Sequence, residues 1–265
     1  MARLIWAPHV DLGRSAQAGL KYAMPTIFAI ELSSELASCA LLQGDLVRRR
    51  EASGVRTHSQ SVLPMVLELL QEADIALKDC DAIAFGAGPG SFTGVRTACG
   101  IAQGLAFGAG LPVVPVVTLD AMALACCQQY AAADILVVLD ARMGEVYWGQ
   151  YRFADGPATG PITVVAPTLS APGAVQARGA GVVACGNGLA AYAEAFAARP
   201  FGGDAYPAIM PHAAQIAMLA RRAFAAGAWV PPREAQPLYL RNKIAFTSAE
   251  RHAMQMAKAA AQAGL

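Results

Sequence analysis

Hydrophobic residues follow two spacings along this chain, and their alternation predicts an α/β protein. Near the start, apolar runs at residues 26–32 and 38–43 and a third run at 46–53 have the length of strands. A Gly-Asp turn joins the last two, so the three runs predict a meander. Residues 59–73 then change to helical spacing.

The predicted helix at 59–73 has an unusually broad apolar face. Val62, Val66 and Leu69 recur at helical spacing, and Leu63 and Leu67 form a stripe beside them. One side can cover a sheet while the other meets a partner, and a wholly internal face is the alternative. We take Val62, Val66 and Leu69 as candidates for an interface with another protein.

The next segment predicts a β-loop-α-β unit, with strands at 81–85 and 113–117 around a helix at 94–108. Right-handed crossover makes these strands parallel. Residues 97–119 carry no charge and are long enough to span a bilayer, but their glycines and prolines favour a buried helix and strand. We therefore expect no membrane span.

The second half predicts further helices and strands in an order related to the first half. Its elements are a helix at 119–132, strands at 135–139, 146–153 and 181–185, and helices at 189–198 and 212–226. Residues 155–181 are rich in Pro, Gly and Ala and give little structural signal. The chain after Tyr239 is expected to fray.

This order of elements is that of the actin-like ATPase fold, a ribonuclease H-like architecture with two lobes, of which the second is reduced here. The predicted division has five parts. These are an upstream extension at 1–23, a first lobe at 24–120, a second lobe at 121–209, a helix and tail returning to the first lobe at 210–245, and a final tail at 246–265.

A glycine-rich loop at residues 86–96 joins a predicted strand to a helix N-terminus. Backbone N–H groups and the helix dipole favour an anion there, and Ser91 and Thr93 add hydroxyl donors. The loop lacks the lysine of a P-loop and does not match a nucleophile elbow. A tight turn that lets strand and helix pack closely is the alternative. The candidate phosphate-binding residues are Gly88, Gly90, Ser91, Thr93 and Gly94.

Glycines recur every four residues on the helix after this loop, at Gly100, Gly104 and Gly108. One face of the helix is therefore cleared of side chains and permits close backbone approach. The neighbour is either the protein's own sheet or a helix of a partner. We take these three glycines as further interface candidates.

Composition and charge narrow the function classes. The formal net charge of +1 gives no overall field for nucleic acid or an anionic membrane. Six cysteines without a C-x-x-C pair are typical of a reducing compartment, so we expect a cytoplasmic location. The four histidines lack metal-ligand spacing, and no metal site is expected. Glu31, at a strand end before Ser33 and Ser34, offers a carboxylate where an actin-like fold would meet nucleotide phosphate or magnesium. An ordinary surface group is the favoured interpretation of Glu31.

Five motifs together resemble the TsaB family of bacterial tRNA threonylcarbamoyladenosine biosynthesis proteins, also described as YeaZ-type and glycoprotease-like. The resemblance covers about residues 24–245. The motifs are AIELSS at 29–34, HSQ at 58–60, GPGSFTGVR at 88–96, DARMGEVYW at 140–148 and YLRN at 239–242.

The resemblance implies an actin-like two-lobed fold and a role in placing threonylcarbamoyl on N6 of adenosine 37 in tRNA. In that system the paralogue TsaD is the catalytic subunit and uses threonylcarbamoyl-adenylate, while TsaE supplies an ATPase. TsaB is a non-catalytic partner that pairs with TsaD and meets tRNA through the complex. The subunit then requires no cofactor of its own, and ATP or ADP is expected only at an interface of the complex.

Two differences bear on activity, the first from the catalytic paralogues and the second from the usual pattern of the family. Two histidine metal ligands of the catalytic paralogues align with Thr118 and Met122, neither of which is a competent ligand for a hard metal. Where the family usually shows Asp-Thr, this chain has Glu31 and Leu32, which weakens nucleotide binding by this lobe alone.

The leading hypothesis is therefore an accessory subunit with no catalytic residues. A stand-alone actin-like hydrolase, peptidase or small-molecule kinase is the alternative. A homodimer that buries the same surface until the partner protein binds is a third hypothesis.

Overall fold

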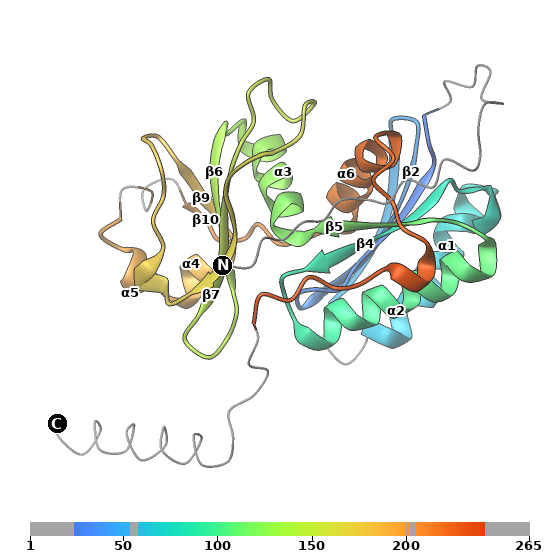
Figure 1. Ribbon diagram of the computed structural model, residues 1–265, viewed down its shortest axis with the longest axis horizontal. Coiled ribbons are helices and arrows are strands. Elements are labelled where there is room, and N and C mark those ends of the chain that lie inside the picture. Colours follow the sequence, from blue (N-terminus) through green and yellow to red (C-terminus); the bar gives the residue numbers. More distant parts are fainter. Residues whose placement is uncertain (1–23, 54–57, 200, 202–204, 242–265) are drawn as a thin grey trace, which may run out of the picture.

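The computed structural model describes residues 24–53, 58–199, 201 and 205–241. They form two lobes, each built on one five-stranded sheet (Figure 1). Within these residues, no helix combines the length and apolar character needed to cross a membrane. The predicted extension at 1–23 and the final tail at 246–265 lie outside the described residues.

The first sheet has the strand order β3-β2-β1-β4-β5. Its strands are β1 (Ile27–Glu31), β2 (Leu36–Gln43), β3 (Leu46–Ser53), β4 (Ala82–Gly88) and β5 (Val113–Val117). The first three form the predicted antiparallel meander, whereas β4 pairs in parallel with both β1 and β5. Every residue of β1 and β4 is buried, which is why both are almost continuous apolar runs.

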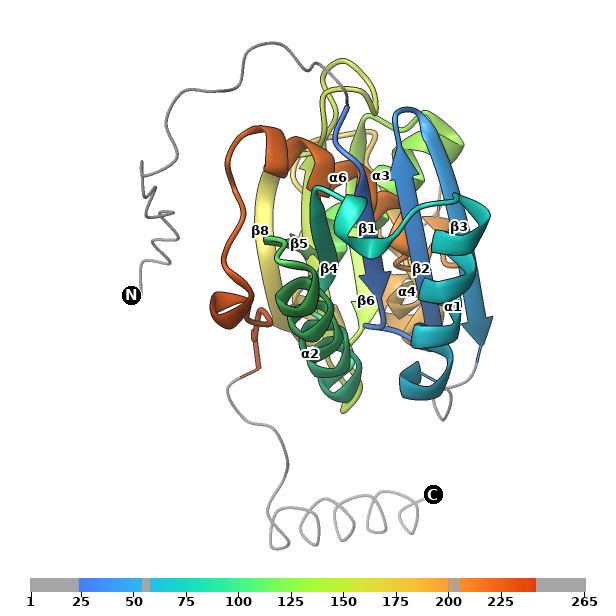
Figure 2. The ribbon, with the colours of Figure 1, turned by 90° about the vertical axis from the view of Figure 1, so that its right-hand side faces the viewer.

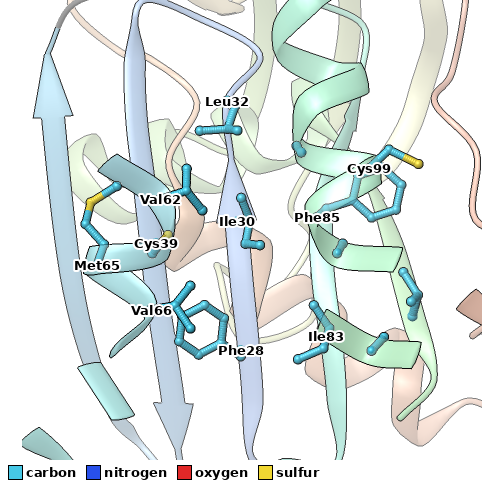
Figure 3. Close-up of a cluster of buried hydrophobic side chains, with 14 of the residues drawn as sticks. Phe28, Ile30, Leu32, Cys39, Val62, Met65, Val66, Ile83, Phe85 and Cys99 are labelled. Atoms are coloured by element: carbon cyan, nitrogen blue, oxygen red, sulfur yellow. The ribbon is translucent and has the colours of Figure 1, made fainter. Parts of the chain in front are cut away.

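Helices cover both faces of this sheet (Figure 2). On one face, α1 (His58–Glu72) and α2 (Phe92–Ala109) bury a core that includes Phe28 and Phe85 (Figure 3). On the opposite face lies α6 (Ala213–Ala225), whose Ile216 packs with Ile27. The chain therefore returns to the first lobe after completing the second.

The second sheet has the order β10-β9-β6-β7-β8. Its strands are β6 (Asp134–Asp140), β7 (Val146–Arg152), β8 (Ile162–Ser170), β9 (Val183–Cys185) and β10 (Ala205–Tyr206). Side chains of β6 point alternately to the two faces of this sheet and pack into two different hydrophobic cores. Ile135 and Val137 pack with α3 (Thr118–Tyr130), and Leu136 and Val138 face the short helices α4 (Gly188–Ala191) and α5 (Ala193–Phe196).

Three local features differ from the sequence-based expectation. Strand β8 lies where no element was predicted, and it tolerates Pro167 because an edge strand does not need every N–H. The helix predicted at 189–198 is two short helices broken at Tyr192. The prediction that the chain frays after Tyr239 is wrong for the next two residues. Leu240 packs on the core of the second lobe, and Arg241 forms an ion pair with Glu145.

The titration of Asp120, in the first turn of α3, should make the free energy of unfolding depend on pH. Burial raises the pKa of Asp120 to about 6, and the Tyr151 hydroxyl only partly opposes this rise. As the pH rises, the Asp120 carboxyl of the unfolded chain ionises at a lower pH than that of the folded protein. The free energy of unfolding therefore falls between about pH 4 and about pH 6, by up to about 3 kcal/mol.

We therefore expect Asp120→Asn to raise the free energy of unfolding at neutral pH and to flatten its decline across that window. Urea unfolding at a series of pH values measures both effects. Asp155→Asn, at an exposed position, is the matched control and should leave the profile unchanged. An unaltered decline in Asp120→Asn would rule out this role for Asp120.

Candidate functional site

A cavity of about 340 Å³ lies between the two lobes. The β1–β2 turn and the start of α2 line it from the first lobe, and the β6–β7 turn lines it from the second. Residues 238–241 lie along the same cavity. Its lining includes Ser33, Ser91, Asp140, Arg142, Tyr239 and Arg241.

Four of the five sequence motifs meet at this interlobe cavity. Ser33 comes from the motif at 29–34, Ser91 from 88–96 and Arg142 from 140–148. Tyr239 belongs to the motif at 239–242, far away in the sequence. The fold therefore brings together segments that the sequence keeps apart.

Polar contacts hold the two lobes together around the cavity. Arg142 of the second lobe pairs with Glu35 of the first at 2.7 Å, and Arg241 pairs with Glu145 at 2.6 Å. The Arg142–Glu35 pair is exposed, so it contributes at most about 1 kcal/mol. The segment after α6 is also bound to the first lobe, because Leu238 N donates to Ala87 O at 2.7 Å.

An arginine lies between two aromatic rings at the cavity's edge. The guanidinium carbon of Arg96 is 3.2 Å from the Phe92 ring centroid and 4.6 Å from that of Tyr239. These contacts bind the segment after α6, which contains Tyr239, to the first turn of α2. They fix the chain at the point where the first lobe faces the second.

Three glycines of the loop make room for the β1–β2 turn. A Cβ at Gly86 would overlap with the carboxyl of Glu31, and one at Gly94 would overlap with the carbonyl oxygen of Leu32. At Gly90 it would collide with Ser33. Close packing of the chain against itself therefore requires these glycines.

Backbone N–H groups of the loop donate within the protein. Gly88 N donates to Thr118 Oγ1 at 3.2 Å, and Ser91 N donates to Ser33 O at 2.7 Å. Ser91 caps α2, since its Oγ accepts from Gly94 N at 3.3 Å. Phosphate binding by Gly88, Gly90, Ser91, Thr93 and Gly94 stays a prediction, and these internal bonds weigh against it.

Glu31 is fully buried, so the expectation of a surface group is wrong. Its carboxyl accepts from Ser33 N at 2.5 Å and lies 3.4 Å from the Thr118 hydroxyl. Burial raises the pKa of Glu31 above its ordinary value, against the effect of hydrogen bonds from Ser33, Thr118 and Leu32.

Thr118 and Met122, the positions that align with metal-binding histidines, are both fully buried. The Thr118 hydroxyl is committed to Gly88 and Glu31, and a Cβ at Gly186 would touch the Met122 methyl group. Across residues 24–53, 58–199, 201 and 205–241, His, Cys, Asp and Glu side chains form no group of three suited to a metal ion.

The candidate interface residues divide into two groups. Val62, Val66 and Leu69 belong to the core of the first lobe, with exposures of 0%, 3% and 0%, so their assignment to an interface is corrected. The inner stripe of α1 covers the sheet, as the wholly internal alternative for that stripe requires.

The outward-facing residues of α1 and α2 form a second group. Leu63 and Leu67 are 50% and 68% exposed, and Phe107 is 82% exposed. Gly100 and Gly104 face outward, as does Gly108, and a Cβ added at any of the three glycines would meet no atom within 4 Å. We call these six residues the helical face; α1 and α2 lie on the same side of the sheet (Figure 2).

Two lobes around a cleft, with a meander followed by a β-loop-α-β unit, define an actin-like α/β protein. The family model of tRNA N6-adenosine threonylcarbamoyltransferase, TsaD, matches residues 49–225. Curated proteins named tRNA threonylcarbamoyladenosine biosynthesis protein TsaB match most of the chain. The Haemophilus influenzae protein is 36% identical over 229 residues, which cover 83% of this chain and 95% of that protein.

The Escherichia coli protein of the same name is 38% identical over 223 residues, covering 83% of this chain and 96% of that protein. A crystal structure from Pseudomonas aeruginosa, described as an uncharacterized protein with similarity to peptidase YEAZ, is 37% identical with a TM-score of 0.77. The match covers 82% of this chain and all of that one. This chain belongs to the TsaB family, which confirms the family resemblance and the fold.

Proposed function

We propose that this chain is a non-catalytic partner subunit in the biosynthesis of threonylcarbamoyladenosine in tRNA, pairing with a catalytic paralogue of the TsaD type. Its curated relatives carry the name of that biosynthesis, and the family model it matches is that of the transferase. In this proposal, TsaE and tRNA meet the subunit through the complex, in the cytoplasm. ATP or ADP belongs at an interface of the complex.

The helical face is the feature of the structure that best supports pairing with the paralogue. Leu63, Leu67 and Phe107 expose apolar side chains on the same layer as a row of glycines without side chains. Exposed apolar patches of this kind are typical of protein interfaces. The glycine row lets a partner helix approach the backbone of α2 closely, which increases the packed area.

The buried state of Thr118 and Met122 supports the non-catalytic role. A threonine hydroxyl and a thioether are poor ligands for a hard catalytic metal. The Thr118 hydroxyl is, in addition, already bonded inside the protein. Metal-dependent transfer therefore belongs to the paralogue in this proposal.

A transfer assay tests the division of roles. With unmodified tRNA and threonylcarbamoyl-adenylate, we expect no modified adenosine from the isolated chain. We expect product when the catalytic paralogue and the ATPase are added, and less when this chain is left out. Transfer by the isolated chain would contradict the non-catalytic role.

Peptidase activity is a second candidate because the Pseudomonas aeruginosa relative is described by its similarity to a peptidase. Ser91 is the loop hydroxyl that a hydrolase would use, but its Oγ caps α2. Both ring nitrogens of His212 are engaged, Nδ1 by Ala214 N and Nε2 by Glu51. Cleavage of a peptide substrate that is lost in Ser91→Ala would favour this candidate.

A further inference from the structure

The buried carboxyl of Glu31 lies among hydrogen-bond donors. The Ser33 backbone N–H donates to it at 2.5 Å, and the Thr118 hydroxyl lies 3.4 Å from it. The Ser33 hydroxyl is buried beside it without a hydrogen bond of normal geometry. Donors that converge in this way favour an anion, and we call the Ser33 N–H, the Ser33 hydroxyl and the Thr118 hydroxyl the nest.

The nest connects directly to the glycine loop. Gly88 N donates to Thr118 Oγ1, and the Thr118 hydroxyl lies 3.4 Å from Glu31 Oε2. Gly86 lies against the same carboxyl, and any side chain there would overlap with it. The loop backbone, the hydroxyl and the carboxyl thus form one buried polar cluster.

The nest adjoins the interlobe cavity. Ser33 and Gly90 both line that cavity, and Ser33 is also the residue whose N–H binds the carboxyl. A ligand in the cavity would therefore reach the nest if the carboxyl were absent. With the carboxyl present, the donors are satisfied and the volume is filled.

We propose that the Glu31 carboxyl group occupies this nest beside the interlobe cavity and excludes phosphate-bearing ligands from it. Two effects act together. The side chain fills the volume that a phosphate oxygen would need, and it takes the donors that would bind one. This proposal concerns the isolated chain, so it does not depend on pairing with a paralogue.

Removal of the carboxyl should convert the nest into a phosphate site. We expect inorganic phosphate to raise the melting temperature of Glu31→Ala in a saturable manner, since a ligand that binds only the folded state stabilises it. The wild-type protein should show no rise beyond that in sodium chloride of equal ionic strength. Isothermal titration should give at least about tenfold tighter phosphate binding for the variant, a difference within reach of a few hydrogen bonds.

Three controls separate the nest from a general charge effect. Glu31→Gln keeps the volume filled and should gain no phosphate binding. Asp155→Ala removes an exposed acid that does not line the cavity, and should gain none either. In the double variant Glu31→Ala, Gly86→Ala, the new methyl group refills the space and should remove the gain.

Glu31→Ser gives a second opening variant if the alanine variant does not fold, since serine keeps one polar group in the nest. Absence of phosphate binding in both opening variants would overturn the proposal. Saturable phosphate binding by the wild-type protein that shifts the amide resonances of Ser33 and Gly88 would also overturn it. An equal gain in Asp155→Ala would show that charge alone is responsible.

Discussion

Gly94→Ala is expected to destabilise the protein by about 3 kcal/mol or more, at the upper end for overpacked sites. A Cβ at this position would overlap with the carbonyl oxygen of Leu32. That obstacle is backbone rather than a flexible side chain. It follows directly after β1, the central strand of the first sheet, so relief requires the sheet or the start of α2 to shift.

Gly104→Ala on the same helix is the matched control. A Cβ there meets nothing within 4 Å, and alanine is favoured over glycine inside a helix by about 1 kcal/mol. We expect this variant to be more stable than the wild-type protein. Urea unfolding of both variants measures the contrast, and equal effects of the two substitutions would show that Gly94 is not held by contact with Leu32.

Gly104→Glu is expected to abolish pairing with the catalytic paralogue while leaving the fold intact. Gly104 is exposed, and glutamate is a good helix former, so the isolated chain should remain stable. At an interface that packs closely on the glycine row, however, the carboxylate would be buried without a partner. Gel filtration of the variant with the paralogue should give two separate peaks.

Two further variants define the surface. Leu67→Glu, at a side chain 68% exposed in the same helical face, should also weaken pairing. Ile162→Glu, at a side chain 57% exposed on the edge strand of the second lobe, should leave it unchanged. A normal complex with Gly104→Glu, or a lost one with Ile162→Glu, would place the partner elsewhere.

The first lobe could be predicted well from the sequence because its signals are strong. The buried strands are continuous apolar runs, and the change to helical spacing marks α1 clearly. Strand β8 gave no such signal. It is an edge strand with Pro167 in its interior, and its residues are only partly buried, so no alternation between apolar and polar positions develops.

The spacing on α1 predicted a helix but not which stripe covers the sheet. Val66 and Leu67 are neighbours of similar hydrophobicity, yet one is 3% and the other 68% exposed. The difference depends on where the helix axis lies relative to β2 and β3. A broad apolar face contains no information about that rotation.

The role of the glycine loop depended on contacts between strands. Glu31 meets Gly86 because β1 and β4 are parallel neighbours, with Ile30 opposite Phe85. Sequence alone contains the glycines and the glutamate but not this register. For the same reason, a carboxyl at a strand end was expected at the surface although the structure encloses it.

Light scattering coupled to gel filtration, on an equimolar mixture of this chain and its catalytic paralogue, measures pairing most directly. We expect one species whose mass is that of a complex containing both chains, and its loss with Gly104→Glu. Two species with the masses of the separate proteins, at concentrations where both are folded, would contradict the proposed partner role.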